Sequence, residues 1–156
     1  MYVTGISPTT VDTTATYGLG TLGGTTSANG IKIFVYAKGV ASCAVGSFVV
    51  FDEAWASALV THQAYGGVGL APAAITASKF GWYQVYGYNA AGKVLASCAD
   101  NAAAYTSGTA GSLDDAGASQ TLISGAHPRA AVGGSAGTVA FSLYWPVAGA
   151  YGAAAA

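Results

Sequence analysis

The strongest strand signal in the chain is the stretch Gly81-Trp82-Tyr83-Gln84-Val85-Tyr86-Gly87-Tyr88. Aromatic and β-branched residues dominate it, and such side chains suit the pleated surface of a sheet. It is followed by Asn89-Ala90-Ala91-Gly92, a segment typical of a turn. Because successive side chains of a strand point to opposite faces, this strand places large rings on both faces of its sheet.

Similar strand signals recur along the chain, separated by turn segments such as Asn29-Gly30. No segment has the periodicity of a long amphipathic helix, although residues 98–105 leave a single helical turn behind an Asp-Asn cap as an alternative. We therefore predict roughly eight to ten short strands in one all-β domain, an antiparallel β-barrel or β-sandwich. The predicted strands are residues 31–37, 48–51, 68–71, 82–88, 93–96 (as a partner or continuation of the one before), 105–106, 112–113, 121–125 and 138–144.

The two ends of the chain differ in composition from its middle. Residues 1–30 are rich in Thr and Gly and have no regular periodicity, which is typical of an extended arm or a tail. We expect residues 1–16 to form an N-terminal arm that lies on a neighbouring subunit. Residues 17–148 are expected to form the folded domain, and residues 149–156 an Ala/Gly-rich C-terminal tail.

The chain carries very few charges. Charged residues make up 7% of the sequence, five basic against six acidic, whereas soluble domains usually have about a quarter of their residues charged. Such a surface is better suited to contact with other copies of the chain or with another protein than to existence as a free monomer. The basic residues are scattered, which argues against binding to nucleic acid. No apolar run of about 18 residues is present, and the N-terminus lacks the regions of a signal peptide, so we expect no membrane association.

Soft metal ligands are few in this chain: Cys43, Cys98, His62 and His127. None of them has the paired spacing of a zinc site, so we predict neither a metal ion nor another cofactor. In a chain expected to fold in the reducing cytosol, both cysteines are predicted to be free thiols.

Two glycine patterns match known motifs in spacing alone. Residues 18–23 have the spacing of a dinucleotide-binding loop, but the strand before it and the helix after it are missing from the pattern. Residues 133–137 have the spacing of a nucleophile elbow, but no Asp, Glu or His follows Arg129 to complete a triad. We interpret both patterns as loop glycines.

The carboxylate pairs Asp52-Glu53 and Asp114-Asp115 are the remaining candidates for acid–base chemistry. Adjacent carboxylates on a strand point to opposite faces, which prevents them from meeting at one substrate. Both pairs also lie where predicted strands end, a position that favours Asp in turns. We therefore interpret them as solvated turn residues, and we predict no catalytic residues and no enzyme.

Aromatic residues are the main candidates for binding. One face of a sheet buries only half of the rings, so the others suit an interface between subunits. Stacking on a sugar or on single-stranded nucleic acid is the alternative. His127-Pro128-Arg129 is interpreted as a polar loop, with a contact between subunits and an ordinary exposed turn as alternatives. The predicted interface residues are Tyr2, Tyr17, Trp82, Tyr83, Tyr86, Tyr88, Arg129, Tyr144 and Trp145.

Several short stretches resemble one family of viral head proteins. They are Leu19-Gly20-Thr21, Asn29-Gly30, Phe34-Val35-Tyr36-Ala37, Val49-Val50-Phe51-Asp52, Gly81-Trp82-Tyr83-Gln84-Val85-Tyr86-Gly87, Val94-Leu95-Ala96-Ser97-Cys98-Ala99, and Tyr105-Thr106 through Ala110-Gly111-Ser112-Leu113-Asp114-Asp115. Together they extend over roughly residues 17–146, and the family they resemble is the capsid decoration (cement) proteins of tailed bacteriophages.

The resemblance implies a non-enzymatic virion protein, assembled in the host cytoplasm and located on the outer surface of the capsid. Proteins of this kind commonly form homotrimers that clamp neighbouring subunits of the major capsid protein and so stabilise the head. Residues 1–16 and the tail 149–156 would then carry the capsid contacts. The alternative function is a tail-fibre or spike module that recognises host glycan.

Overall fold

The structure is a computed structural model that describes residues 1–149, and its regular elements there are all β-strands. The strands are β1 (Tyr2–Thr4), β2 (Val11–Asp12), β3 (Leu22–Ser27), β4 (Gly30–Lys38), β5 (Phe48–Phe51), β6 (Ser57–Leu59), β7 (Gly66–Leu70), β8 (Phe80–Val94), β9 (Ala104–Tyr105), β10 (Leu122–Pro128) and β11 (Gly137–Ala148). The prediction of a single all-β domain is confirmed. The predicted tail, residues 149–156, lies outside the described residues apart from Gly149.

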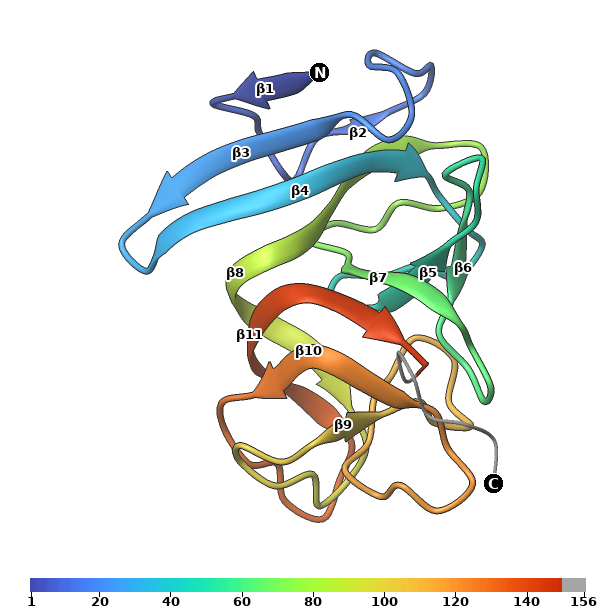
Figure 1. Ribbon diagram of the computed structural model, residues 1–156, viewed down its shortest axis with the longest axis vertical. Helices are drawn as coiled ribbons and strands as arrows, with labels where there is room; N and C mark the ends of the chain where they lie inside the picture. The colour runs from blue at the N-terminus through green and yellow to red at the C-terminus, as the bar shows by residue number, and fades with distance from the viewer. Residues whose placement is uncertain (150–156) are drawn as a thin grey trace.

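All the strands belong to one strongly bent sheet (Figure 1). Its main path runs β1-β3-β4-β8-β11-β7-β5-β6, while β10 pairs with β11, β9 with β10, and β2 with β8. The sheet does not close into a barrel, since β1 and β6 lie at the two ends of this path. It is also mixed, and not purely antiparallel as predicted, because β1 runs parallel to β3.

The centre of the sheet is the antiparallel pair of β4 and the first half of β8. Val35 lies opposite Tyr83, and Tyr36 lies opposite Trp82. Val35 and Tyr83 pack into the core on one face, while Tyr36, Trp82 and Phe34 pack into a separate cluster on the other. Because both faces are covered, this part of β4 is a continuous apolar run, as in strands that are buried on both sides.

Residues 1–16 cover the second face of this pair. The Ile6 side chain is buried at 8% exposure in the cluster that contains Trp82, and the Tyr36 hydroxyl donates a hydrogen bond to the Asp12 carboxylate. β1 pairs with β3, and β2 pairs with β8, so the segment adds two short strands to the sheet (Figure 1). The segment was expected to lie on a neighbouring subunit. In the structure it lies on the sheet of its own chain, where it covers the Trp82 face that would otherwise be open to water.

A second hydrophobic core lies against the second half of β8 and most of β11. Phe141 of β11 and Phe48 of β5 pack edge to face there, with ring centroids 4.9 Å apart. The predicted turn at residues 89–92 is wrong, since β8 continues to Val94 and Gly92 lies opposite Val139. A Cβ at position 92 would lie 2.5 Å from the Phe141 ring. The glycine therefore makes room for a packed aromatic pair and does not mark a turn.

Some other local predictions differ from the structure. Residues 98–105 contain turns and the short strand β9 instead of a helical turn. His127 and Pro128 belong to strand β10 and not to a loop, because they pair with Ser142 and Phe141 of β11. The free-thiol prediction is confirmed, since both cysteines are buried and unpaired.

The cover supplied by the N-terminal segment can be tested with one substitution. Ile6→Ala is expected to lower the free energy of unfolding by about 2–5 kcal/mol, because it removes a buried side chain from the Trp82 cluster. Thr14→Ala, in the exposed part of the same segment, should change it by no more than about 0.5 kcal/mol. Urea denaturation measures both. Equal stability of the two variants would show that the segment does not pack on its own domain in solution.

Candidate binding surfaces

Two of the predicted interface residues belong to the core. Trp82 and Tyr83 are 2% and 0% exposed, so the prediction that they contact a partner is wrong. The physical reason is that the chain covers both faces of β8 by itself. Tyr17 is half-buried and packs on Tyr36 and Trp82, with ring centroids 5.2 Å and 5.1 Å away. It completes the same cluster. Tyr2, in contrast, is exposed on β1 at the end of the sheet.

The structure brings three other predicted residues, Tyr86, Tyr88 and Tyr144, together on one face of β8 and β11. Tyr86 lies opposite Tyr144, Tyr88 lies opposite Ser142, and Ser142 also lies opposite His127. The rings of Tyr86 and Tyr144 are nearly perpendicular, with centroids 5.9 Å apart. A groove of about 510 Å³ runs over this face, here called the tyrosine groove. It is lined by Asn29, Gly30, Ile31, Tyr86, Gly87, Tyr88, Ser142 and Tyr144.

The pairing of β8 with β4 is irregular next to Tyr86. The pairing between β4 and β8 shifts register at Val85, because the neighbouring residues Ile33 and Phe34 of β4 lie opposite Tyr86 and Gln84. The buried Gln84 side chain donates hydrogen bonds of 3.1 Å to the carbonyl oxygens of Tyr86 and Tyr88. Gly87 has a φ of 95°, and a Cβ there would collide with the Ile31 carbonyl oxygen. Position 87 therefore has to be glycine for the hairpin and β8 to approach this closely.

Arg129 lies at the edge of the tyrosine groove. Its Nε–H donates to Ser142 Oγ at 2.9 Å, and its Nη1 donates to Asn101 Oδ1 at 2.5 Å. The guanidinium is therefore fixed beside a groove residue although Arg129 is exposed. The His127 ring lies 6.4 Å from the Tyr144 ring. The groove lining itself includes no charged residue, and Arg129, bonded to Ser142 Oγ, brings a positive charge to its edge.

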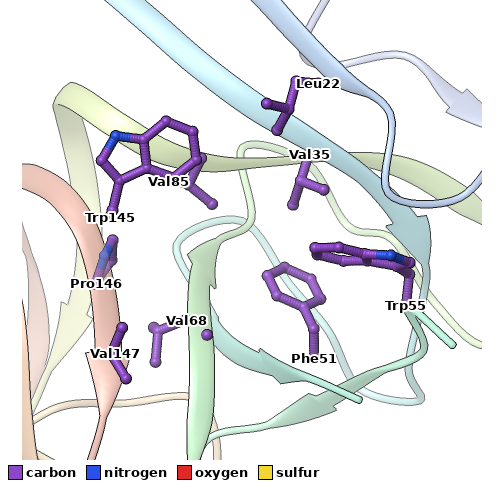
Figure 2. Close-up of a pocket in the computed structure, with 10 residues that line it drawn as sticks. Leu22, Val35, Phe51, Trp55, Val68, Val85, Trp145, Pro146 and Val147 are labelled. Atoms are coloured by element: carbon purple, nitrogen blue, oxygen red, sulfur yellow. The ribbon is translucent and has the colours of Figure 1, made fainter. Parts of the chain in front are cut away.

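A second surface is an apolar pocket of about 160 Å³ with two tryptophans on opposite sides (Figure 2). This tryptophan pocket is lined by Leu22, Val35, Phe51, Trp55, Gly67, Val68, Val85, Trp145, Pro146 and Val147. Trp55 and Trp145 are 37% and 48% exposed. Every lining residue is glycine or apolar, and a dry apolar cavity of about 150 Å³ is large enough to take up benzene. The pocket therefore suits one apolar side chain.

Both tryptophans occupy the left-handed region of the backbone, with φ of 58° at Trp55 and 52° at Trp145. This conformation costs a residue other than glycine roughly 1–2 kcal/mol. The turn at Trp55 is held by Asp52, whose Oδ1 accepts hydrogen bonds from the Ala54 and Ala56 amides at 2.9 Å and 2.8 Å. The kink at Trp145 arises because residues 144–146 of β11 lie opposite Gly125 alone.

Trp55 is the exposed pocket residue that sequence analysis missed. The available signal was its position two residues after Glu53 of the Asp52-Glu53 pair, because a large ring in a turn has no strand neighbours to cover it. Trp145 was predicted as an interface residue, and the structure places it exposed on the rim of the pocket.

The two thiols are not activated for catalysis. Burial raises the pKa of the Cys43 thiol. Burial, together with the charges of Asp115 and Asp114, raises the pKa of Cys98 to about 11. Both groups are therefore protonated near neutral pH, whereas a cysteine nucleophile needs a lowered pKa.

Asp115 and His62, both in loops, have structural partners. Asp115 Oδ2 accepts the Ala99 amide hydrogen bond at 2.8 Å, and His62 Nδ1 lies 2.5 Å from Gln120 Oε1.

Residues 18–23 lead into strand β3, and residues 133–137 lead into β11, so neither glycine pattern is followed by a helix. Within residues 1–149, no cluster of three or more His, Cys, Asp or Glu side chains is arranged to hold a metal ion. The same part of the chain has no helix of the length and apolar character needed to cross a membrane.

Comparisons of the chain with protein-family models, with curated proteins and with solved structures gave no match.

The backbone strain at Trp145 can be measured by comparing two truncations of the side chain. Trp145→Gly should be more stable than Trp145→Ala by about 1 kcal/mol, because only glycine adopts the left-handed region without strain. The adjacent residue Tyr144 has no positive φ and serves as the control. There the order should reverse, with alanine the more stable by about 0.5–1 kcal/mol. Urea denaturation measures the free energy of unfolding of the four variants. If alanine is more stable than glycine at both positions, or glycine at both, the backbone at Trp145 is not specifically strained.

Proposed function

We propose that the chain is a non-enzymatic structural protein of a virion, a decoration or cement protein that binds the outer face of the major capsid protein lattice and stabilises the head. The observation that carries this proposal is the tryptophan pocket, where two exposed rings are kept in strained backbone around an apolar cavity. Such strain persists where the position of the side chain serves a function. The resemblance of the sequence to phage decoration proteins supplies the class of partner.

The chemistry of the tryptophan pocket suits a protein partner. With no charged residue in its lining, it would accept an apolar side chain of the major capsid protein and exclude water around it. Tryptophans in such positions dominate the energy of many protein interfaces. The low charge of the rest of the chain, 7% of its residues, reduces the cost of removing the surrounding surface from water.

Assembly on a lattice strengthens contacts of this size. One pocket buries a small area, but a homotrimer that engages several capsid subunits at once gains affinity from multivalency without any new contact. We therefore propose a homotrimer on the outer capsid surface, assembled in the host cytoplasm, with Trp55 and Trp145 as the capsid contacts.

A second candidate function is a virion module that recognises host glycan. The tyrosine groove favours it, because tyrosine rings, an amide and a hydroxyl line one open groove. Side chains of these types combine an apolar surface with hydrogen-bonding groups, as sugar recognition requires.

Binding to purified heads that were assembled without this protein tests the first proposal. Trp55→Ala and Trp145→Ala should each weaken binding at least about thirtyfold, which corresponds to the roughly 2 kcal/mol lost at an interface hot spot. Tyr65→Ala removes an exposed ring outside the pocket and should bind like the unchanged protein. Co-sedimentation with heads measures all three. Failure of the unchanged protein to bind heads, or full binding by both tryptophan variants, would contradict the proposal.

A further inference from the structure

We infer that the tyrosine groove binds an oligosaccharide that carries a carboxylate, and that Arg129 pairs with that carboxylate. The inference rests on the second proposed function and specifies its site and the chemical class of its ligand. It is independent of the tryptophan pocket and of capsid binding.

The size and lining of the groove fit a short sugar chain. Its volume of about 510 Å³ falls within the range of roughly 300–1,000 Å³ found for small-molecule sites. Tyr86 and Tyr144 pack edge to face, so the groove presents aromatic rings in two orientations. Each ring offers an apolar face for the C–H groups of a sugar and a hydroxyl for its polar edge. Tyrosine also loses little conformational entropy on binding.

Hydrogen-bonding groups distinguish this groove from the tryptophan pocket. Asn29 contributes an amide from the tip of the β3–β4 hairpin, and Ser142 contributes a hydroxyl from β11. Sugar hydroxyls that lose water on binding need such partners, because unpaired polar groups are costly to bury. The tryptophan pocket, lined by apolar residues and glycine, offers hardly any. Of the two surfaces, the groove is therefore the one suited to a sugar.

Charge favours an acidic sugar over a neutral one. Arg129 is fixed beside the groove by its bonds to Ser142 and Asn101, and these use the Nε–H and one Nη1–H. The remaining N–H groups of the guanidinium can form the paired hydrogen bonds that a carboxylate accepts. The groove lining contains no carboxylate to compete for them.

Nucleic acid is a poorer fit for the same surface. A single arginine neutralises one phosphate, whereas binding to a nucleic-acid backbone needs several basic side chains in a row. All five basic residues lie outside the groove lining itself, and Arg129 is the one with a side-chain hydrogen bond to a lining residue, Ser142. One carboxylate per few sugar units matches one arginine.

The test uses the full chain and an array of glycans in matched pairs, each acidic glycan beside its methyl ester, with sialylated and uronic-acid oligosaccharides among them. We expect binding to at least one acidic member and weaker binding to its ester. For that glycan, titration calorimetry should show a loss of affinity of about tenfold or more with Arg129→Gln. Arg129→Lys should retain part of the preference for the acid, because it keeps the charge but loses the planar fork.

Two further variants locate the site. Tyr144→Ala should weaken binding to the acid and to its ester alike, because it removes a stacking ring. Tyr65→Ala, an exposed tyrosine outside the groove, should bind as the unchanged protein does. Urea unfolding of each variant ensures that a loss of binding reflects the groove and not the fold.

The outcomes separate the inference from the function on which it rests. Binding to glycans without preference for the acid, or unaffected by Arg129→Gln, overturns the inference and leaves glycan recognition standing. Binding to acidic glycans that Tyr144→Ala leaves intact places the site elsewhere and also overturns it. Binding to no glycan overturns both the inference and the second proposed function. Loss of head binding by Tyr144→Ala and Arg129→Gln, with no glycan bound, would identify the groove as a protein interface.

Discussion

The structure depends on the central pair of strands β4 and β8 being buried on both faces by the same chain. Tyr83 and Val35 face one core, and Trp82 and Tyr36 face another. Antiparallel sheets commonly leave one face exposed to water, and their strands then alternate between apolar and polar residues. Here the N-terminal segment closes the second face through Ile6. A chain with few charges can therefore cover most of its large rings without a partner.

Two of the exposed aromatic residues, Tyr144 and Trp145, lie where the pairing of β11 is interrupted. Val85 and Trp145 line the tryptophan pocket, and the neighbouring residues Tyr86 and Tyr144 line the tyrosine groove. The two surfaces therefore share the same stretch of β8 and β11, with neighbouring residues turned to one surface or the other. The register shifts in these strands direct the rings outward, because a bulge bends a strand and changes the direction of its side chains. The two candidate binding surfaces of this fold therefore lie at irregularities of its strands.

Much of the fold could be predicted from local sequence. The strand at residues 48–51 has the predicted bounds, and β4 and β11 lie where aromatic and β-branched residues indicated strands. β3 was missed because Leu22–Ser27 is rich in Gly and Thr and becomes a strand only by pairing with β4. The site was harder to predict. Whether Trp82 is core or interface depends on a segment some 70 residues away in sequence, and periodicity within β8 carries no information about that segment.

The burial of β8 on both faces is tested most directly by comparing the solvent access of Trp82 with that of Trp145. Acrylamide quenching of fluorescence can be measured in two proteins with one tryptophan each, one that keeps Trp82 and one that keeps Trp145, with phenylalanine at the other two positions. The account predicts that Trp82 is strongly shielded, with emission at short wavelength, and that Trp145 is readily quenched. Quenching of Trp82 as efficient as that of Trp145 would contradict the account, because it would mean that the N-terminal segment leaves the second face of β8 open to water.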